Sequence, residues 1–213
     1  MSVPIVHVVD DDESMRVAVA RLLRAEGHEV RTYASAGDFL LAPPEPGPGC
    51  LVLDLQMPGP SGLDLQAALQ RHPTPLPVVF LTGRGDVASS VRAMKSGAVD
   101  FLTKPVEPAA LVKAVETALA RDRSARAQQE NIGEAQARFA KLTLRERSVF
   151  EHVVAGKINK QIADKLGITE RTVKMHRAQV MTKMGAGSIA ELVHLADSLG
   201  QRDTPAQPSP PEG

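Results

Sequence analysis

The first half of the chain alternates short apolar runs with segments of helical periodicity. The apolar runs are rich in β-branched residues and end at polar residues, which is typical of strands buried on both faces. We expect strands at 5–10, 50–55, 77–82 and 98–105, with a weaker candidate at 29–34, and helices at 14–26, 36–42, 62–71, 86–96 and 108–121. Five strands alternating with five helices predict an α/β fold, in which helices cover both faces of a parallel sheet.

The second half has a different pattern and contains no convincing strand. Thr143 followed by Glu146 forms the pattern of a capping box at the start of a helix. From there to residue 199 the apolar spacing predicts four short helices, with breaks at Gly156, Gly167 and Gly185–Gly187. The pattern therefore predicts a small all-α domain.

Two of these helices have the spacing of a helix-turn-helix motif. Asn159 can cap a helix over 160–166, and the turn Gly167–Thr169 ends in a residue that can cap the next helix. Glu170 favours the start of that helix, over 170–184, because an acidic side chain stabilises a helix N-terminus. A helix, a tight turn and a second helix are the elements of the motif.

The two patterns are separated by a linker and followed by a tail. Residues 123–140 are rich in Ala, Gln and Arg with few apolar positions, which predicts a helical or partly flexible linker. The Pro-rich, polar residues 201–213 are expected to be disordered. We therefore expect one domain over 1–122 and a second over 141–200.

The formal net charge of zero conceals an asymmetry between the two domains. Residues 1–122 carry 11 Lys and Arg against 15 Asp and Glu, whereas residues 141–200 carry 10 against 6. An acidic domain joined to a basic one indicates different partners for each. The basic domain is the candidate for binding nucleic acid.

The composition argues against several classes of protein. The chain has no Trp and a single Tyr, so a site lined with aromatic rings for a sugar or a single strand is not expected. No apolar run approaches the ~20 residues that a membrane-spanning helix needs, and the first residues lack the pattern of a signal peptide. Cys50 is the single cysteine, and it precedes an apolar run, as a small buried residue would. These features predict a cytoplasmic protein without membrane contact.

Acidic residues are concentrated directly after the first predicted strand, at Asp10–Glu13. A solvated turn, or acid in the first turn of a helix, would explain them locally. A cation site is the alternative, and it needs further carboxylates. In a doubly wound sheet, ligands bind beyond the carboxyl ends of the strands, and this brings Asp54, Thr82 and Lys104 to the same edge.

Three carboxylates at one point raise each other's pKa values unless a cation lies between them. Mg2+ suits a few carboxylate oxygens and retains several waters. A carboxylate beside Mg2+ can attack phosphorus, and Asp54, which ends an apolar strand, is the natural acceptor. The hydroxyl of Thr82 and the ammonium of Lys104 can then bind the remaining phosphoryl oxygens.

Residues 4–121 resemble the receiver domain of two-component response regulators, in the segments VVDDDESMR, LVLDLQMPGPSGLDL, VVFLTGRGD and MKSGAVDFLTKPV. The resemblance implies a flavodoxin-like, doubly wound fold with strand order 2-1-3-4-5. It implies phosphorylation of Asp54 by a sensor histidine kinase. It also implies a Mg2+ site formed by Asp10, Asp11, Asp54 and the backbone carbonyl of Gln56.

The same resemblance implies a conformational switch. Phe101 lies three residues before Lys104, where the family places its switch aromatic, although a core Phe of the fifth strand is an equal alternative. Thr82 is then expected to move toward the phosphoryl group while the aromatic ring turns inward behind it. The family also has a candidate cis peptide bond at Lys104–Pro105.

Phosphorylation is expected to pair two copies of the chain. Val87, Val91 and Met94 lie near one face of the helix predicted over 86–96, and periodicity does not distinguish a core face from a dimer patch. We expect Val91 and Lys95 near a dimer interface. In the last helix, over 188–199, Leu192 is expected to pair two DNA-binding domains around a two-fold axis.

The helix predicted over 170–184 is basic. A solvated charged face would explain its composition, but the preceding turn and the charge excess favour binding to DNA. The basic residues are Arg171, Lys174, His176, Arg177 and Lys183.

Residues 142–196 closely resemble a LuxR-type helix-turn-helix domain, so that the whole chain resembles a response regulator of the FixJ/NarL family. The resemblance implies that Lys160 reaches a phosphate and that Lys174 reads a base, since Lys can donate to guanine O6 and N7. Ala178 departs from relatives that carry a basic residue there. The residues implied to face DNA are Thr172, Lys174, Met175, His176 and Arg177.

The sequence therefore predicts a transcription regulator, most simply an activator, that binds double-stranded DNA as a homodimer after phosphorylation of Asp54. RNA polymerase is a further candidate partner. The alternative is a DNA-binding regulator whose receiver responds to a partner or ligand without phosphorylation. An enzyme, such as a phosphatase with a transient aspartyl-phosphate, is least supported, because no second acid is placed for leaving-group chemistry.

Overall fold

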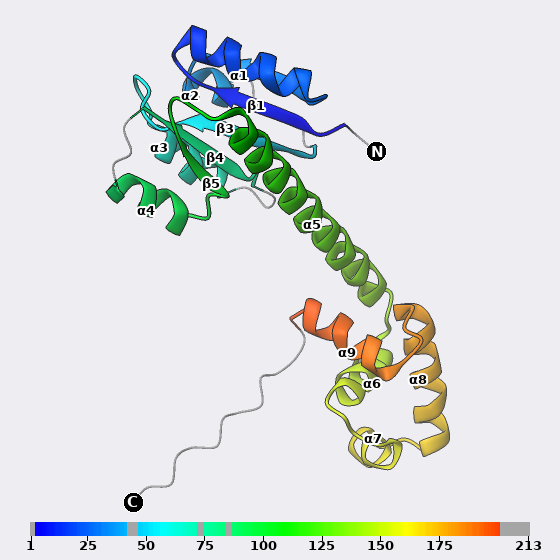
Figure 1. Ribbon diagram of the computed structural model, residues 1–213. Helices are drawn as coiled ribbons and strands as arrows, with labels where there is room; N and C mark the ends of the chain where they lie inside the picture. The colour runs from blue at the N-terminus through cyan, green and yellow to red at the C-terminus, as the bar shows by residue number, and fades with distance from the viewer. Residues whose placement is uncertain (1–2, 42–46, 72–74, 84–86, 201–213) are drawn as a thin grey trace, which may run out of the picture. The chain divides into compact units, whose positions relative to one another are not determined.

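The computed structural model describes residues 3–41, 47–71, 75–83 and 87–200, and the chain divides into two compact units, Met1–Ala127 and Gln128–Gly213 (Figure 1). We describe each unit by itself. The tail expected at 201–213 lies outside the described residues.

The N-terminal unit is built on a parallel five-stranded sheet in the order β2-β1-β3-β4-β5. This confirms the α/β fold and the strand order expected from the sequence. Every residue of β3 is buried, because the central strand is covered on both faces. The strands are β1 (Ile5–Val9), β2 (Glu29–Tyr33), β3 (Gly49–Asp54), β4 (Val78–Thr82) and β5 (Asp100–Thr103).

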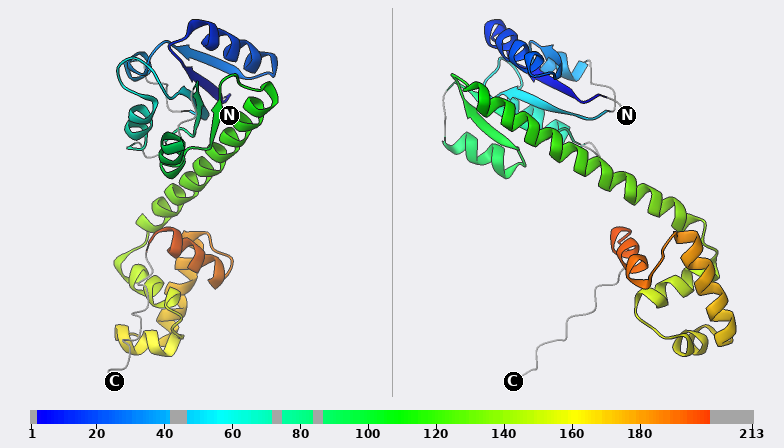
Figure 2. Two further views of the ribbon diagram at one scale, coloured as in Figure 1. Left: turned by 60° about the vertical axis from the view of Figure 1, so that its left-hand side comes forward. Right: turned by 45° about the vertical axis from the view of Figure 1, so that its right-hand side comes forward.

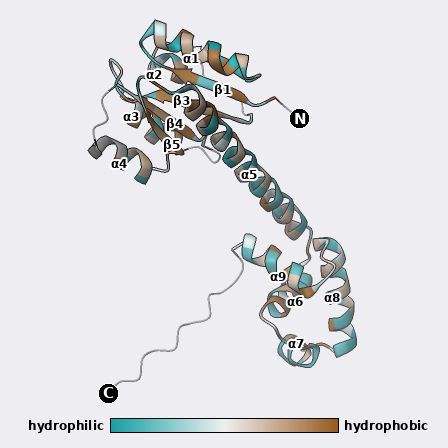
Figure 3. Cartoon of the chain, viewed as in Figure 1, coloured by the Kyte–Doolittle hydropathy of each residue, from teal (hydrophilic) through white to brown (hydrophobic). Residues whose placement is uncertain are grey.

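Helices cover both faces of the sheet (Figure 2). Helix α1 (Glu13–Ala25) and the first turns of α5 (Pro108–Ala140) pack on one face, where Val8 joins their apolar cluster. The helices on the other face contact the cluster of Val9. Successive strand residues point to opposite faces, which gives the two clusters and the apolar strands seen in Figure 3. The helices of the second face are α2 (Ala36–Leu41), α3 (Gly62–Leu69) and α4 (Val87–Lys95).

The register of the strands aligns their carboxyl ends. Val9 pairs with Leu53, Asp54 pairs with Leu81, and Thr82 pairs with Thr103. The residues that follow β1, β3, β4 and β5 therefore meet at one edge of the sheet, as the doubly wound topology requires.

A buried histidine on β1 makes the N-terminal unit sensitive to acid. The side chain of His7 is buried beside the rings of Tyr33 and Phe39, and its Nδ1 lies 3.1 Å from the Tyr33 hydroxyl. Burial, and then the charge of Arg31, lowers the pKa of His7 from 6.5 to about 4.

The unfolded chain binds a proton at this histidine near pH 6.5, whereas the folded chain does so only near pH 4. The free energy of unfolding therefore decreases as the pH falls through this window, and at pH 5 it is lower by about 2 kcal/mol. Urea titrations that follow the fluorescence of Tyr33, the single Tyr of a chain without Trp, report on this unit. We expect His7→Leu to remove this part of the pH dependence, and an unchanged pH dependence would contradict the assignment.

Helix α5 continues through the region expected to be a linker and contributes to both units. In the N-terminal unit, Asp122 Oδ2 accepts hydrogen bonds from the Gly49 N–H at 3.0 Å and from Arg126 Nε at 2.8 Å. In the C-terminal unit, the ring of Phe139 packs edge-on against Phe150, with centroids 5.2 Å apart. The two ends of the helix are thus each fixed by contacts within their own unit.

The C-terminal unit contains the four short helices expected from the sequence. Gly167 and Gly185 have positive φ angles of 64° and 68° and end two of them, as expected for residues without a Cβ. The helices pack around one apolar core whose largest side chains include Phe150, Ile162 and Met184. They are α6 (Leu144–Val154), α7 (Asn159–Leu166), α8 (Glu170–Met184) and α9 (Ile189–Ser198).

The structure corrects two sequence expectations in this unit. Asn159 does not cap α7, because it is the first helical residue and the N-cap is Ile158. Leu192 is fully buried in the core of the unit, so its side chain is not available to a second copy, and its assignment to a dimer interface is wrong. Apolar periodicity alone did not distinguish a core residue from an interface residue.

In the N-terminal unit, by contrast, Val91 and Met94 are 45% and 48% exposed, and Lys95 is exposed. These residues of α4 form a surface rather than a core face. None of the helices in the described parts of the chain combines the length and apolar character needed to span a bilayer.

Candidate functional site

The first carboxylate of the candidate site belongs to Asp10, which follows β1 and is 1% exposed. One of its oxygens accepts the Asp12 N–H at 2.9 Å, and the other lies 2.7 Å from the ammonium of Lys104. Burial raises the pKa of Asp10, because desolvation of the carboxylate outweighs the opposing hydrogen bond and charge of Lys104.

The second carboxylate belongs to Asp54, the last residue of β3, and it is 5% exposed. Its Oδ1 accepts the Gln56 N–H at 3.2 Å, and its Oδ2 lies 2.9 Å from Lys104 Nζ. Lys104 therefore pairs with Asp10 and Asp54 at once. Burial acts to lower the pKa of Lys104, but the hydrogen bonds and charges of the two carboxylates outweigh it and raise that pKa.

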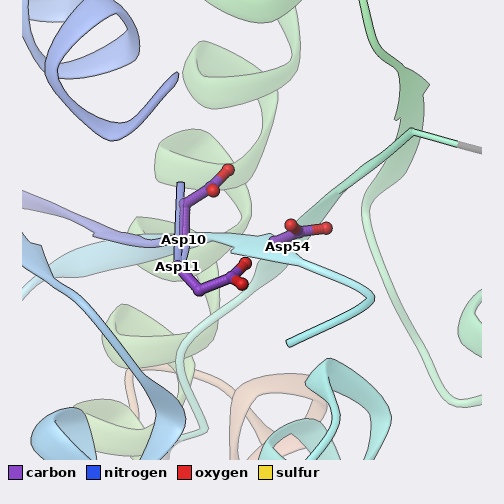
Figure 4. A group of neighbouring side chains, drawn as sticks. All are labelled: Asp10, Asp11 and Asp54. Atoms are coloured by element: carbon purple, nitrogen blue, oxygen red, sulfur yellow. The ribbon is translucent and has the colours of Figure 1, made fainter. Parts of the chain in front are cut away.

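Asp11 adds a third carboxylate, which is exposed. One oxygen from each of Asp10, Asp11 and Asp54 lies within 4.8 Å of the others, and Figure 4 shows the three side chains gathered at the same edge. Among the described residues, the ammonium of Lys104 pairs with two of these three carboxylates, which leaves an excess of negative charge in the cluster. An all-oxygen donor set with excess negative charge fits a hard divalent cation such as Mg2+.

Gln56, Thr82 and Lys104 lie at the same edge, whereas Phe101 pairs with Phe80 in the middle of β4. Thr82 is fully buried at the end of β4, and its carbonyl accepts the Lys104 N–H at 2.7 Å. Phe101 lies half-buried in β5, with its ring 6.3 Å from that of Phe80 between centroids. Gln56 is exposed two residues after Asp54. The peptide bond between Lys104 and Pro105 is cis, as the resemblance implied.

The acidic run after β1 serves two purposes. Asp10 and Asp11 join the carboxylate cluster, whereas Asp12 is the N-cap of α1. Its side chain accepts the N–H groups of Ser14 and Met15 at 2.8 and 3.2 Å. The acidic run therefore contains both a helix cap, as the local explanation predicts, and two members of a carboxylate cluster, as the alternative requires.

Two residues that support the site were not identified from the sequence. Arg16 Nη1 donates to the backbone carbonyl of Asp10 at 2.7 Å and so fixes the end of β1. Gly62 begins α3, where a Cβ would lie 2.4 Å from the carbonyl oxygen of Asp54 and 3.0 Å from the Phe80 ring. An arginine four residues into a helix and a glycine at a helix start carry no sequence signal for these contacts.

Gly62→Ala is expected to destabilise the N-terminal unit by about 1–3 kcal/mol, because the added methyl group forces the backbone at Asp54 to move. Gly37→Ala is the matched control: its Cβ would lie 3.5 Å from Ser35 Oγ, an ordinary contact, and alanine favours a helix. Urea unfolding followed by Tyr33 fluorescence measures both variants. Equal stability of the two variants would contradict the close approach at Gly62.

The residues expected to face DNA differ in exposure. Lys160, Lys174 and Met175 are exposed. Thr172 and His176 are half-buried, and the Thr172 N–H donates to the hydroxyl of Thr169, the N-cap of α8, at 3.2 Å. Arg177 is also half-buried, and its Nη1 donates to Asn159 Oδ1 on α7 at 2.8 Å.

The C-terminal end of α8 is fixed to its neighbours by charged side chains. Lys183 Nζ lies 2.6 Å from Glu146 Oε2, and the same carboxylate completes the expected capping box with Thr143. Hydrogen bonds from Lys183 and from the Thr143 N–H lower the pKa of Glu146. Arg138 Nη1 of α5 donates to the Met184 carbonyl at 3.3 Å, near the negative end of the helix dipole.

Two known families match the chain, one in each of its two compact units. Residues 6–116 match the family described as "Response regulator receiver domain", and residues 140–196 match "Bacterial regulatory proteins, luxR family". The chain is 44% identical over 196 residues to Nodulation protein W of Bradyrhizobium diazoefficiens, covering 92% of this chain and 86% of that protein. It is 46% identical over 191 residues to the transcriptional regulatory protein FixJ of Azorhizobium caulinodans, covering 90% of each.

Solved structures show the same similarity. The response regulator StyR matches with a TM-score of 0.79 at 44% identity, covering 92% of this chain and 99% of StyR. Full-length FixJ from B. japonicum matches with a TM-score of 0.57 at 40% identity, covering 95% of this chain and all of that one.

Proposed function

The chain belongs to the two-component response regulators that join a receiver domain to a LuxR-type DNA-binding domain, and we propose that phosphorylation of Asp54 controls its activity as a transcription regulator. The observation that carries this proposal is the cluster of Asp10, Asp11, Asp54 and Lys104 at one edge of the sheet. We assign the receiver domain to 1–122, the linker to 123–140 and the DNA-binding domain to 141–200.

In the proposed reaction, a carboxylate oxygen of Asp54 attacks the phosphorus of a phosphoryl donor, the donor's bond to that phosphorus breaks, and an aspartyl-phosphate remains. Mg2+ bound by Asp10, Asp11, Asp54 and the Gln56 carbonyl would supply positive charge to the phosphoryl oxygens. Lys104 holds a second positive charge at the site, 2.9 Å from the Asp54 carboxylate. Thr82 and Phe101 are the proposed switch residues, through which the phosphorylated state differs from the free one.

The second part of the proposal is sequence-specific binding to double-stranded DNA. The exposed Lys174 and Met175 of α8 would enter the major groove, with Thr172 and His176 beside them, and Lys160 of α7 would contact a phosphate. Residues 141–200 carry a charge excess of four Lys and Arg over Asp and Glu, which supports attraction to DNA.

Pairing of two copies would connect the two parts. The exposed Val91, Met94 and Lys95 of α4 are the proposed contact surface, and a two-fold dimer would match a palindromic DNA site. A sensor histidine kinase is the proposed phosphoryl donor, and RNA polymerase is the proposed partner of an activator.

The alternative regulator, controlled by a partner or ligand without phosphorylation, is not favoured, because the carboxylate cluster and Lys104 are complete. The chain's family consists of DNA-binding regulators rather than classical enzymes. We propose no turnover of a separate substrate.

The proposal is tested by DNA affinity. A duplex is first selected from random-sequence DNA with the full chain treated with acetyl phosphate and Mg2+; we call it the selected duplex. We expect treated wild-type protein to bind this duplex more tightly than untreated protein, and treated Asp54→Asn to bind like the untreated form. Equal binding by treated wild type and treated Asp54→Asn would show that phosphorylation is not the control.

A further inference from the structure

One basic residue of α8 lies on the inner face of that helix. Val173, Val180 and Met184 are the buried residues of α8, and Arg177 follows Val173 by four positions and precedes Val180 by three. Residues at these spacings share one face of a helix. Arg177 therefore lies on the same face of α8 as the buried residues, whereas Lys174 and Met175 are exposed.

The guanidinium of Arg177 has a partner within the protein. Its Nη1 donates to the side-chain oxygen of Asn159 at 2.8 Å, and both residues are half-buried. The bond joins the middle of α8 to the first residue of α7. It thus connects the two helices of the helix-turn-helix at the end where α7 begins.

The start of α7 needs such support. Its N-cap, Ile158, has an apolar side chain that makes no capping hydrogen bond and is 62% exposed. Gln161 supplies one contact, because its Oε1 accepts the Ile158 N–H at 3.1 Å. The bond from Arg177 to Asn159 ties this first turn to α8.

We propose that Arg177 is a positioning residue that acts on DNA binding through Asn159, rather than a residue that contacts DNA. Lys160 directly follows Asn159, so the turn that Arg177 fixes also carries the residue proposed to contact a phosphate. Arg177 thereby sets the position of that phosphate contact relative to the exposed face of α8. This inference rests on the proposed DNA-binding function and replaces the direct DNA contact that the family resemblance implied for Arg177.

A double-mutant cycle on the full chain tests the inference. The variants are Arg177→Ala, Asn159→Ala and the double variant, each measured against the selected duplex across a range of salt concentrations. Asn159→Ala places the best helix former at a helical position, so this variant remains folded and keeps Arg177 available for DNA. Circular dichroism at the assay temperature checks that each variant is folded.

We expect Arg177→Ala and Asn159→Ala each to weaken binding about tenfold, which is the effect of losing one hydrogen bond to a charged group. The double variant should be no weaker than Arg177→Ala alone. Between the Asn159→Ala and double variants, the slope of log affinity against log salt concentration should be equal, because no phosphate contact is lost.

A direct contact gives a different result. If Asn159→Ala binds like wild type, the bond between Arg177 and Asn159 does not act on DNA binding and the inference is wrong. If Arg177→Ala weakens binding in the Asn159→Ala background and reduces the salt slope by about 1, Arg177 touches a phosphate, which also contradicts the inference. Failure of wild-type protein to yield any selected duplex would instead contradict the proposed function, so the two failures are distinguishable.

Discussion

Asp54→Asn is expected to abolish incorporation of phosphate from acetyl phosphate into the full chain. The amide lacks the negative charge and the nucleophilic oxygen that attack on phosphorus requires. It also removes one of the three carboxylates that lie within 4.8 Å of one another and so weakens the proposed Mg2+ site. The mass of the intact protein after treatment measures the incorporation.

The matched control is Asp12→Asn, the same chemical change in a neighbouring loop. Asp12 caps α1 and is outside the carboxylate cluster, and asparagine is an equally good N-cap. Asp12→Asn should therefore incorporate phosphate like wild-type protein. Incorporation by Asp54→Asn at the wild-type level would exclude this carboxylate as the acceptor.

The second large effect is expected at Lys174. Its side chain is exposed on α8 and is not one of the buried residues of that helix. Lys174→Ala should weaken binding of the phosphorylated chain to the selected duplex by ~1–3 kcal/mol, because a base contact is lost. Binding to a scrambled duplex of the same composition should weaken less, so that discrimination between the two falls. Fluorescence anisotropy with both duplexes measures the affinities.

Lys113→Ala is the control for this substitution. Lys113 is also an exposed lysine, but it lies in the first turns of α5, outside residues 141–200. Its replacement should leave both affinities unchanged. Undiminished discrimination by Lys174→Ala would remove Lys174 from the residues that read the sequence.

The sequence was sufficient for the sheet and for the gathering of the site residues. Strand order and crossover connections bring the carboxyl ends of parallel strands to one edge, so Asp10, Asp54, Thr82 and Lys104 followed from strand positions alone. The pairing of Lys104 with two buried carboxylates at once did not follow, because side-chain geometry is not encoded in spacing.

Predictions from the local preferences of residues were wrong where contacts between helices determine the structure. Asparagine is a favoured N-cap, yet Asn159 lies inside α7, where its side chain receives the bond from Arg177. Leu192 and Val91 both lie on apolar helix faces, but Leu192 is fully buried whereas Val91 is 45% exposed. The difference depends on which helix faces the neighbouring helices cover, and the apolar spacing within one helix does not show this.

The central claim is that Asp54 takes the phosphoryl group in a pocket that depends on Mg2+, and locating the group tests it most directly. The full chain is treated with acetyl phosphate in the presence of Mg2+ or of EDTA, and then with borohydride, which reduces an aspartyl-phosphate to homoserine. Peptide mass spectrometry then identifies the modified position. The account predicts homoserine at position 54 in the Mg2+ sample alone. Homoserine at a different position, or equal amounts with EDTA, would contradict it.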